Sequence, residues 1–379
     1  MKSLLIWDLP TRLFHWMFAA SFAGAYITAE SDAWLGVHTG LGYLMLGLLA
    51  FRLVWGFAGG HYARFSNFLF SPKQAWRYLL ETLENRAARH LGHNPAGSWA
   101  VYGLLVLGLI VGLTGVFAQG GEEQQGAAAA LLSYDLGHAI KEAHEVVATL
   151  MLLLVFGHIV GVVVESWLHR ENLARSMVTG LKQGPDDASA SRPYRLIGAL
   201  LLLSAAGFSG WWFQYATEEP LEKLVGQSHT AAEPPHVAFI GKPLASNALW
   251  REECSSCHLD FSPGLLPARS WKKLFAAQNQ HFGDDLGLDA ATTQLLLAFA
   301  LENEAGRKRS EAAWKIDRAL KSDATPLRIT ETPYWVKKHR DINDADWRAP
   351  KVRSKANCAA CHLDAEAGTF EDAAMRMPQ

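Results

Sequence analysis

The sequence predicts an all-α protein, with a bundle of membrane-spanning helices followed by a small, mainly helical domain outside the membrane. Of the 379 residues, 50% are hydrophobic and only 19% are charged, which is too apolar for a disordered chain and unusual for a soluble enzyme. The long apolar runs all precede residue 217, whereas residues 246–379 have an ordinary soluble composition. The net charge of −2 excludes a strongly basic nucleic-acid-binding protein.

Five apolar stretches approach or exceed the roughly 20 residues that a helix needs to cross a bilayer. They are residues 13–29, 35–57, 99–118, 144–168 and 196–216. The first stretch is short and contains small residues, so a cleaved signal peptide is an alternative there. Its His15-Trp16 pair is unusual for a signal peptide, and we therefore expect five spans.

The charges between the stretches predict their orientation. Lys and Arg concentrate in residues 58–98 and 169–195, whereas the other connections are acidic (Glu30, Asp32, Glu122, Glu123 and Asp135). The excess of Lys and Arg in cytoplasmic loops predicts that the N-terminus and both basic loops are cytoplasmic. Because the number of spans is odd, the C-terminal domain is expected on the opposite side of the membrane.

Four histidines lie within the apolar stretches, where polar side chains are costly and usually functional. They are His15, His38, His144 and His158. His144 and His158 are 14 residues apart, which separates them by about 21 Å along a helix and about 40° around it. The topology matches His15 with His158 in depth, and His38 with His144. Such pairs on facing helices can each hold a low-spin haem b. Hydrogen-bonded buried histidines are the alternative.

Arg52 follows His38 by 14 residues, so it lies on nearly the same helix face and level with the inner histidine pair. Its guanidinium is suited to pairing with a haem propionate, because Arg forms bidentate contacts with carboxylates. The alternative is that it extends to the cytoplasmic surface of the membrane. The sequence leaves both interpretations open.

The opening segment, residues 7–16 (WDLPTRLFHW), resembles the start of the prokaryotic cytochrome b561 family, which includes the b subunits of nickel-iron hydrogenases. The resemblance covers residues 1–180, and the four histidines fall where that family places its haem ligands. It implies a four-helix transmembrane core with two b haems that exchanges electrons with quinone or a redox partner. The fifth span is additional to that core and is expected to tether the domain that follows.

All four cysteines fall in two copies of one pentamer, Cys254 to His258 and Cys358 to His362, beyond a polar, proline-containing linker at residues 217–245. The C-x-x-C-H pattern is the attachment signature of c-type haem: two thiols bond the haem and the adjacent His reaches its iron. A zinc site is the main alternative. Attachment of haem c requires export, which agrees with the predicted topology.

Each c haem needs a second axial ligand. The candidates are His229, His236, His281, His339, Met375 and Met377. The simplest arrangement pairs His258 with His281 and His362 with His339, although a crossed arrangement is also open. A methionine ligand on the second haem would raise its potential.

The C-terminal segment resembles the dihaem cytochromes c, whose soluble members partner an oxygen-binding haem protein. The matching stretches are residues 253–258, 265–271, 281–283, 332–339 and 357–362. The match covers nearly all of residues 246–379 and implies bis-histidine ligation of both haems. Short helices are expected over residues 289–300 and 310–321.

These observations predict an electron carrier of four domains or segments, 1–180, 181–216, 217–245 and 246–379, in a bacterial inner membrane. It would hold two non-covalent b haems and two covalent c haems, and connect quinone to a periplasmic redox protein. No residue is assigned a catalytic role. The alternatives are a quinol or superoxide oxidoreductase, or the haem anchor of a larger respiratory enzyme. The oligomeric state stays open, a dimer included.

Overall fold

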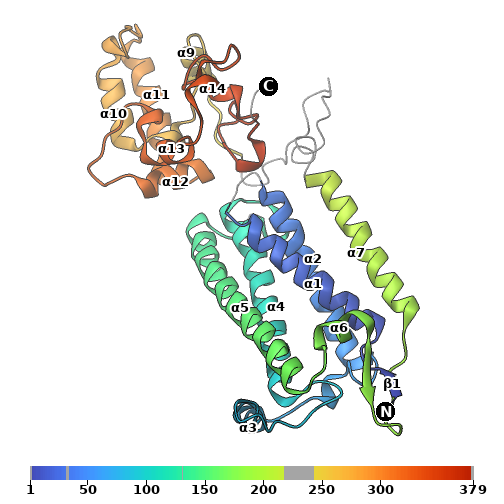
Figure 1. The fold of residues 1–379 in the computed structure, drawn as a ribbon. Coiled ribbons are helices and arrows are strands. Elements are labelled where there is room, and N and C mark those ends of the chain that lie inside the picture. Colours follow the sequence, from blue (N-terminus) through green and yellow to red (C-terminus); the bar gives the residue numbers. More distant parts are fainter. Residues whose placement is uncertain (1, 31–33, 130, 217–242, 377–379) are drawn as a thin grey trace. The chain divides into compact units, whose positions relative to one another are not determined.

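The computed structural model describes residues 2–30, 34–129, 131–216 and 243–376, and they are mainly helical, which confirms the all-α class (Figure 1). They fall into two compact units. The first lies within residues 1–117 and 139–232, and the second within residues 118–138 and 233–379. The connection between the third and fourth long helices therefore belongs to the second unit, which the sequence did not predict.

Helices form at all five expected apolar stretches. They are α1 (Leu9–Thr28), α2 (Leu35–Ala58), α4 (Pro95–Glu122), α5 (Tyr134–Leu168) and α7 (Arg195–Ala216). Among the described helices, α2, α4, α5 and the Arg195–Trp212 part of α7 are long and apolar enough to cross a membrane. α1 is long enough but carries Arg12 and His15 near its start and is not among these four, so its crossing stays a prediction.

The long helices pack through two clusters of apolar side chains. One cluster contains Phe14, Leu48, Leu49 and Leu105, from α1, α2 and α4. The other contains Phe22, Met45, Val111 and Met151, and adds α5. Together these clusters hold the four helices that carry or surround the intramembrane histidines.

Short elements complete the first unit. A two-stranded antiparallel sheet joins β1 (Lys2–Leu5) to β2 (Leu181–Gly184), with Lys2 opposite Gly184. The short helices are α3 (Pro72–Leu83), which begins in a capping box of Ser71 and Gln74, and α6 (Leu173–Thr179). The sheet was not expected, because strands of four residues are too short to show an alternating pattern.

α7 packs against α1 and α2. The indole nitrogen of Trp212 donates a hydrogen bond to the carbonyl of Gly36 (2.7 Å), and its ring lies 5.3 Å from that of Tyr43. The indole also covers Gly40, where any Cβ atom would collide with it. The fifth helix is therefore an integral part of this bundle as well as the connection to the residues that follow.

The second unit consists of short helices around an aromatic core. They are α9 (Ala248–Cys254), α10 (Ala268–Ala276), α11 (Ala290–Asn303), α12 (Glu311–Ala319), α13 (Pro333–Lys338) and α14 (Asp344–Arg348). α11 and α12 confirm the helices expected over 289–300 and 310–321, and the side chains of Asp289 and Ser310 cap their first turns. The largest buried cluster contains Trp250, Trp271, Leu296 and Ala300.

Single 3-10 turns connect the helices of both units. They are η2 (Phe65–Asn67), η3 (Gly126–Ala128), η4 (Pro263–Leu265), η5 (Gln278–Gln280), η6 (Ala305–Arg307), η7 (Ile329–Glu331), η8 (Cys358–Ala360) and η9 (Asp372–Ala374). The second cysteine motif thus begins in η8, whereas the first follows the end of α9.

We expect Gly40→Ala to weaken the packing of α7 by about 1–3 kcal/mol, because the new methyl group must displace the Trp212 indole. Gly207→Ala is the matched control, since a Cβ there meets no atom within 4 Å. A Gly to Ala change in a helix is otherwise stabilising. Thermal unfolding of the protein in detergent should show a lower midpoint for Gly40→Ala only. Equal midpoints for the two variants would contradict the packing of α7.

Candidate functional site

The structure brings the intramembrane histidines together in the two pairs that the sequence predicts. His15 on α1 and His158 on α5 have ring centroids 6.4 Å apart. His38 on α2 and His144 on α5 have ring centroids 6.2 Å apart. One helix, α5, thus supplies a member of each pair, and α1 and α2 supply the other members.

The histidines of the second unit also form two pairs. The ring of His258, which ends the first cysteine motif, lies 6.3 Å from that of His281. The ring of His362, which ends the second motif, lies 6.2 Å from that of His339. The structure therefore brings together the uncrossed pairs that the sequence favoured as the simplest arrangement.

The four ring separations match the spacing of two axial ligands on one iron. Two imidazoles that bind a metal from opposite sides have centroids about 6.3 Å apart, because the metal–nitrogen bond is about 2.0–2.1 Å long and each centroid lies about 1.1 Å behind its nitrogen. The observed separations span 6.2–6.4 Å. Both pairs in each unit therefore fit bis-histidine haem ligation.

Backbone carbonyls orient half of these imidazoles through their Nδ1 atoms. The contacts are His38 to Ala25 (2.8 Å), His144 to Val111 (3.0 Å), His258 to Leu259 (2.6 Å) and His339 to Trp335 (2.8 Å). An Nδ1–H that donates to a carbonyl leaves the lone pair on Nε2 for a metal, which is the usual arrangement of metal-binding histidines. Each of the four pairs except His15–His158 contains at least one histidine oriented in this way.

Burial favours the neutral form of three histidines in the second unit, His281, His339 and His362. It lowers the pKa of His281, to which the neighbouring His258 contributes, and it lowers the pKa of His339 and His362. The Nδ1 atoms of His281 and His362 are buried without a hydrogen-bond partner among the described residues. A neutral imidazole is the form that binds a metal.

The cysteine motifs form tight turns that carry free thiols. In the second motif, the backbone N–H groups of Cys361 and His362 both donate to the carbonyl of Cys358, at 3.1 and 2.9 Å. All four cysteines are free of disulfide bonds, and burial raises the pKa of Cys254 and Cys358 to about 11. The thiols of Cys254 and Cys358 are therefore protonated at neutral pH.

Arg52 is buried at the end of the bundle that carries the His15–His158 pair. Only 3% of it is exposed, its Nη1 has no hydrogen-bond partner among the described residues, and its guanidinium lies 4.7 Å from the centre of the Phe65 ring. The guanidinium therefore does not extend to the protein surface. A buried donor without a partner is suited to an anionic group of a bound cofactor.

His93, in the loop before α4, also carries a buried ring nitrogen. Its ring lies 4.2 Å from that of Phe68 and 4.8 Å from that of Trp7, and its Nδ1 is buried without a partner among the described residues. Burial and then the charge of Arg52 lower its pKa to about 3. No sequence pattern indicates this burial, because His93 precedes α4 in a loop.

Several candidates from the sequence do not take part in these pairs. Met375 forms an isolated β-bridge with His362 through its backbone, while His339 presents its ring to His362. His229, His236 and Met377 lie outside the described residues, as do residues 217–242 of the expected linker.

Paired imidazoles at ligand spacing, on helices that can cross a membrane and beside thiols spaced for haem attachment, define a membrane electron-transfer cytochrome with b-type and c-type haem. Comparison with known families agrees. The family model for prokaryotic cytochrome b561 matches residues 6–180, and that for dihaem cytochrome c matches residues 250–370. Residues 6–180 are therefore similar to the first family and residues 250–370 to the second.

Individual relatives match each part. A probable Ni/Fe-hydrogenase B-type cytochrome subunit from Azotobacter vinelandii is 25% identical over 219 residues, covering 49% of this chain and 90% of the relative. Its counterpart from Rhodobacter capsulatus is 22% identical, with coverages of 49% and 83%. The diheme cytochrome c from Rhodobacter sphaeroides is 38% identical, covering 34% of this chain and 100% of the relative, with a TM-score of 0.31.

Proposed function

We propose that the protein conducts electrons between the quinone pool in the membrane and a periplasmic redox protein through two b haems and two c haems. The observation that carries this proposal is the set of four histidine pairs, each with ring centroids 6.2–6.4 Å apart. Bound haem would supply a one-electron redox change at each pair. Two imidazoles would leave a bound haem iron no free position for oxygen or substrate, which favours electron transfer.

The side chains in this proposal have distinct tasks. His15 with His158, and His38 with His144, hold the two b haems, while His258 with His281, and His362 with His339, hold the c haems. The thiols of Cys254, Cys257, Cys358 and Cys361 anchor the c haems covalently. Arg52 neutralises a propionate of the haem at the His15–His158 pair, which is supported by its buried, unpartnered Nη1.

The proposed topology places the N-terminus in the cytoplasm and residues 246–379 in the periplasm of a bacterial inner membrane. It is supported by the Lys and Arg bias of residues 58–98 and 169–195. It requires α1 to cross as a fifth helix. Under this topology residues 1–180 form the b-haem domain, 181–216 the tether, 217–245 the linker and 246–379 the c-haem domain.

The relatives favour a second candidate function. Those that match the first part of the chain are named as probable B-type cytochrome subunits of Ni/Fe hydrogenases. The corresponding proposal is that this chain anchors an enzyme and receives electrons from it. Mild-detergent purification followed by mass spectrometry distinguishes the two, because an anchor subunit co-purifies with an enzyme in constant ratio and a self-contained carrier does not.

We expect His144→Ala to remove one b haem, because His38 alone cannot hold the macrocycle. A pyridine haemochrome spectrum should change from two b and two c per chain to one b and two c. His61→Ala is the control, since His61 is an exposed loop residue that contacts Asn67. Retention of both b haems in His144→Ala would refute the ligand assignment.

We expect His339→Met to raise the midpoint potential of one c haem, because a thioether ligand favours the reduced iron more than an imidazole does. Lys337→Met, at an exposed position of α13, the helix that ends just before His339, provides the comparison. Lys337→Met removes a positive charge, which should lower the midpoint potential of the haem rather than raise it. Spectroelectrochemical titration measures both, and an unshifted titration of His339→Met would argue for Met375 or Met377 as the native ligand.

The proposed route predicts that a short-chain ubiquinol reduces the c haems by way of the b haems. In stopped-flow absorption measurements on the protein in detergent, the c-haem bands should respond to quinol at least about tenfold more slowly in His158→Ala than in the unaltered protein, a barrier change of about 1.4 kcal/mol. Dithionite should still reduce the c haems in both. Equal rates with quinol would show that electrons do not pass through the His15–His158 pair.

A further inference from the structure

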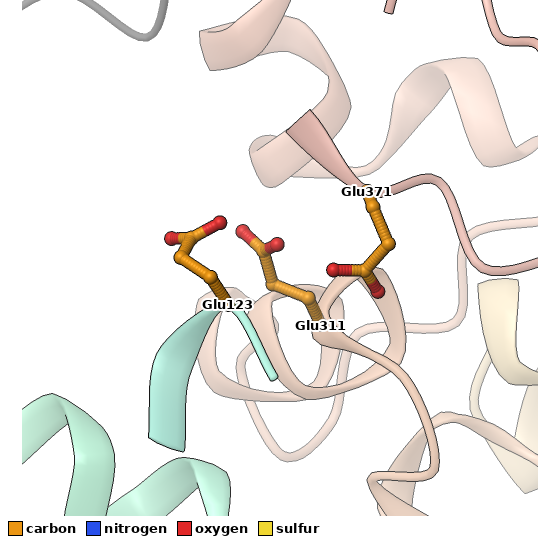
Figure 2. Close-up of side chains that lie close together, drawn as sticks. All are labelled: Glu123, Glu311 and Glu371. Atoms are coloured by element: carbon orange, nitrogen blue, oxygen red, sulfur yellow. The ribbon is translucent and has the colours of Figure 1, made fainter. Parts of the chain in front are cut away.

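Three glutamates of the second unit bring their carboxylates together, as Figure 2 shows. Glu123 directly follows α4, Glu311 is the first residue of α12, and Glu371 immediately precedes η9. One oxygen from each lies within 4.8 Å of the others. Three segments that are far apart in sequence therefore meet at this point through groups of the same charge.

These carboxylates are buried. Glu123 is 8% exposed, and Glu311 and Glu371 are each 1% exposed. One oxygen of Glu311 pairs with the ammonium of Lys315, but its Oε2 and both oxygens of Glu371 have no hydrogen-bond partner among the described residues. A buried carboxylate without a partner is strongly destabilising, so Glu371 indicates a partner other than the side chains that the structure describes.

An uncharged side chain points to the same conclusion independently. Tyr134 is 7% exposed, and its hydroxyl has no hydrogen-bond partner in the described structure. Its ring stacks on that of Trp314 with centroids 6.1 Å apart, and the charges of Glu371, Glu311 and Glu123 all act on its hydroxyl. This buried phenol oxygen is thus a further polar atom near the carboxylates that lacks a partner among the described residues.

The neighbouring charges do not satisfy Glu371. The carboxylate of Asp364 accepts hydrogen bonds from the Glu371 backbone N–H (2.8 Å) and from Thr369, so it adds a further negative charge. Asp372 is paired with Lys338 at 3.0 Å. Lys315 forms an ion pair with Glu311. Burial lowers the pKa of Lys315, whereas the negative charge of Glu311 raises it.

We propose that Glu123, Glu311 and Glu371 form a calcium site, with Tyr134 as a neutral neighbour and water as the remaining ligands. Calcium takes six to eight oxygen ligands at about 2.3–2.6 Å, so two of its ligands can lie up to about 4.6–5.2 Å apart. The 4.8 Å spread of the three carboxylate oxygens falls within that limit. Mg²⁺ bonds of about 2.0–2.1 Å would require the carboxylates to approach more closely.

The ion would tie residues 118–138 to α12 and to the segment after the second cysteine motif. That segment includes Phe370, whose ring lies 5.3 Å from the ring of His362. Calcium would thereby brace the surroundings of one c-haem ligand. The proposal does not depend on the direction of electron flow or on the identity of the redox partners.

The test is calcium binding by the full-length haem-loaded protein in detergent, after EGTA treatment and its removal. Isothermal titration calorimetry should detect one Ca²⁺ per chain, and elemental analysis should recover it. Glu371→Gln, which keeps the size of the side chain, should weaken binding at least about tenfold, or about 1.4 kcal/mol. Glu302→Gln is the matched control, because Glu302 is an exposed carboxylate on α11. Added calcium should raise the unfolding midpoint of the control and of the unaltered protein.

Glu123→Gln provides a second variant, and an unchanged c-haem spectrum shows whether each variant is folded. If either folded variant loses calcium while Glu302→Gln retains it, the site is supported. If the unaltered protein bound no stoichiometric calcium, the proposal would be overturned, and the buried carboxyl groups would be protonated instead. Equal affinity in all variants would place the ion elsewhere, and Mg²⁺ binding as tight as that of calcium would overturn the choice of metal.

Discussion

The pairing of imidazoles from α5 with those from α1 and α2 is the constraint on which the first unit depends. If each pair holds an iron, as we propose, its two helices must keep a fixed separation and orientation, because a metal–nitrogen bond tolerates little variation in length. The apolar clusters of Phe14, Leu48, Phe22 and Met45 lie between the same helices and hold them at that distance. Carbonyls of Ala25 and Val111 then set the ring orientation.

The helices and the histidine pairs could be predicted because they depend on local properties. Apolar length identifies a spanning helix, and residue spacing along a helix fixes the depth of His144 relative to His158. The C-x-x-C-H motifs are equally local, since five consecutive residues carry the chemistry. The structure brings the expected rings together, and their role as ligands stays a prediction that this geometry supports.

The features that could not be predicted depend on contacts between distant segments. β1 pairs with β2, which follows it by more than 170 residues in the sequence. Strands of only four residues carry too little alternating pattern to predict this pairing. The burial of His93 and the meeting of Glu123 with Glu311 and Glu371 arise only when the loops are folded. In sequence, Glu123 resembled an ordinary loop charge. α1 is not among the helices apolar enough to cross a membrane, because its polar first turns dilute its apolar composition.

The continuous 35-residue helix α5 has a consequence for how this chain can vary. Both His144 and His158 lie on this one continuous helix. Adding or deleting a single residue between them would therefore rotate one imidazole by about 100° around the helix axis relative to the other. The segment between His144 and His158 can therefore accept substitutions, but an insertion or a deletion would separate one of the two histidines from its partner.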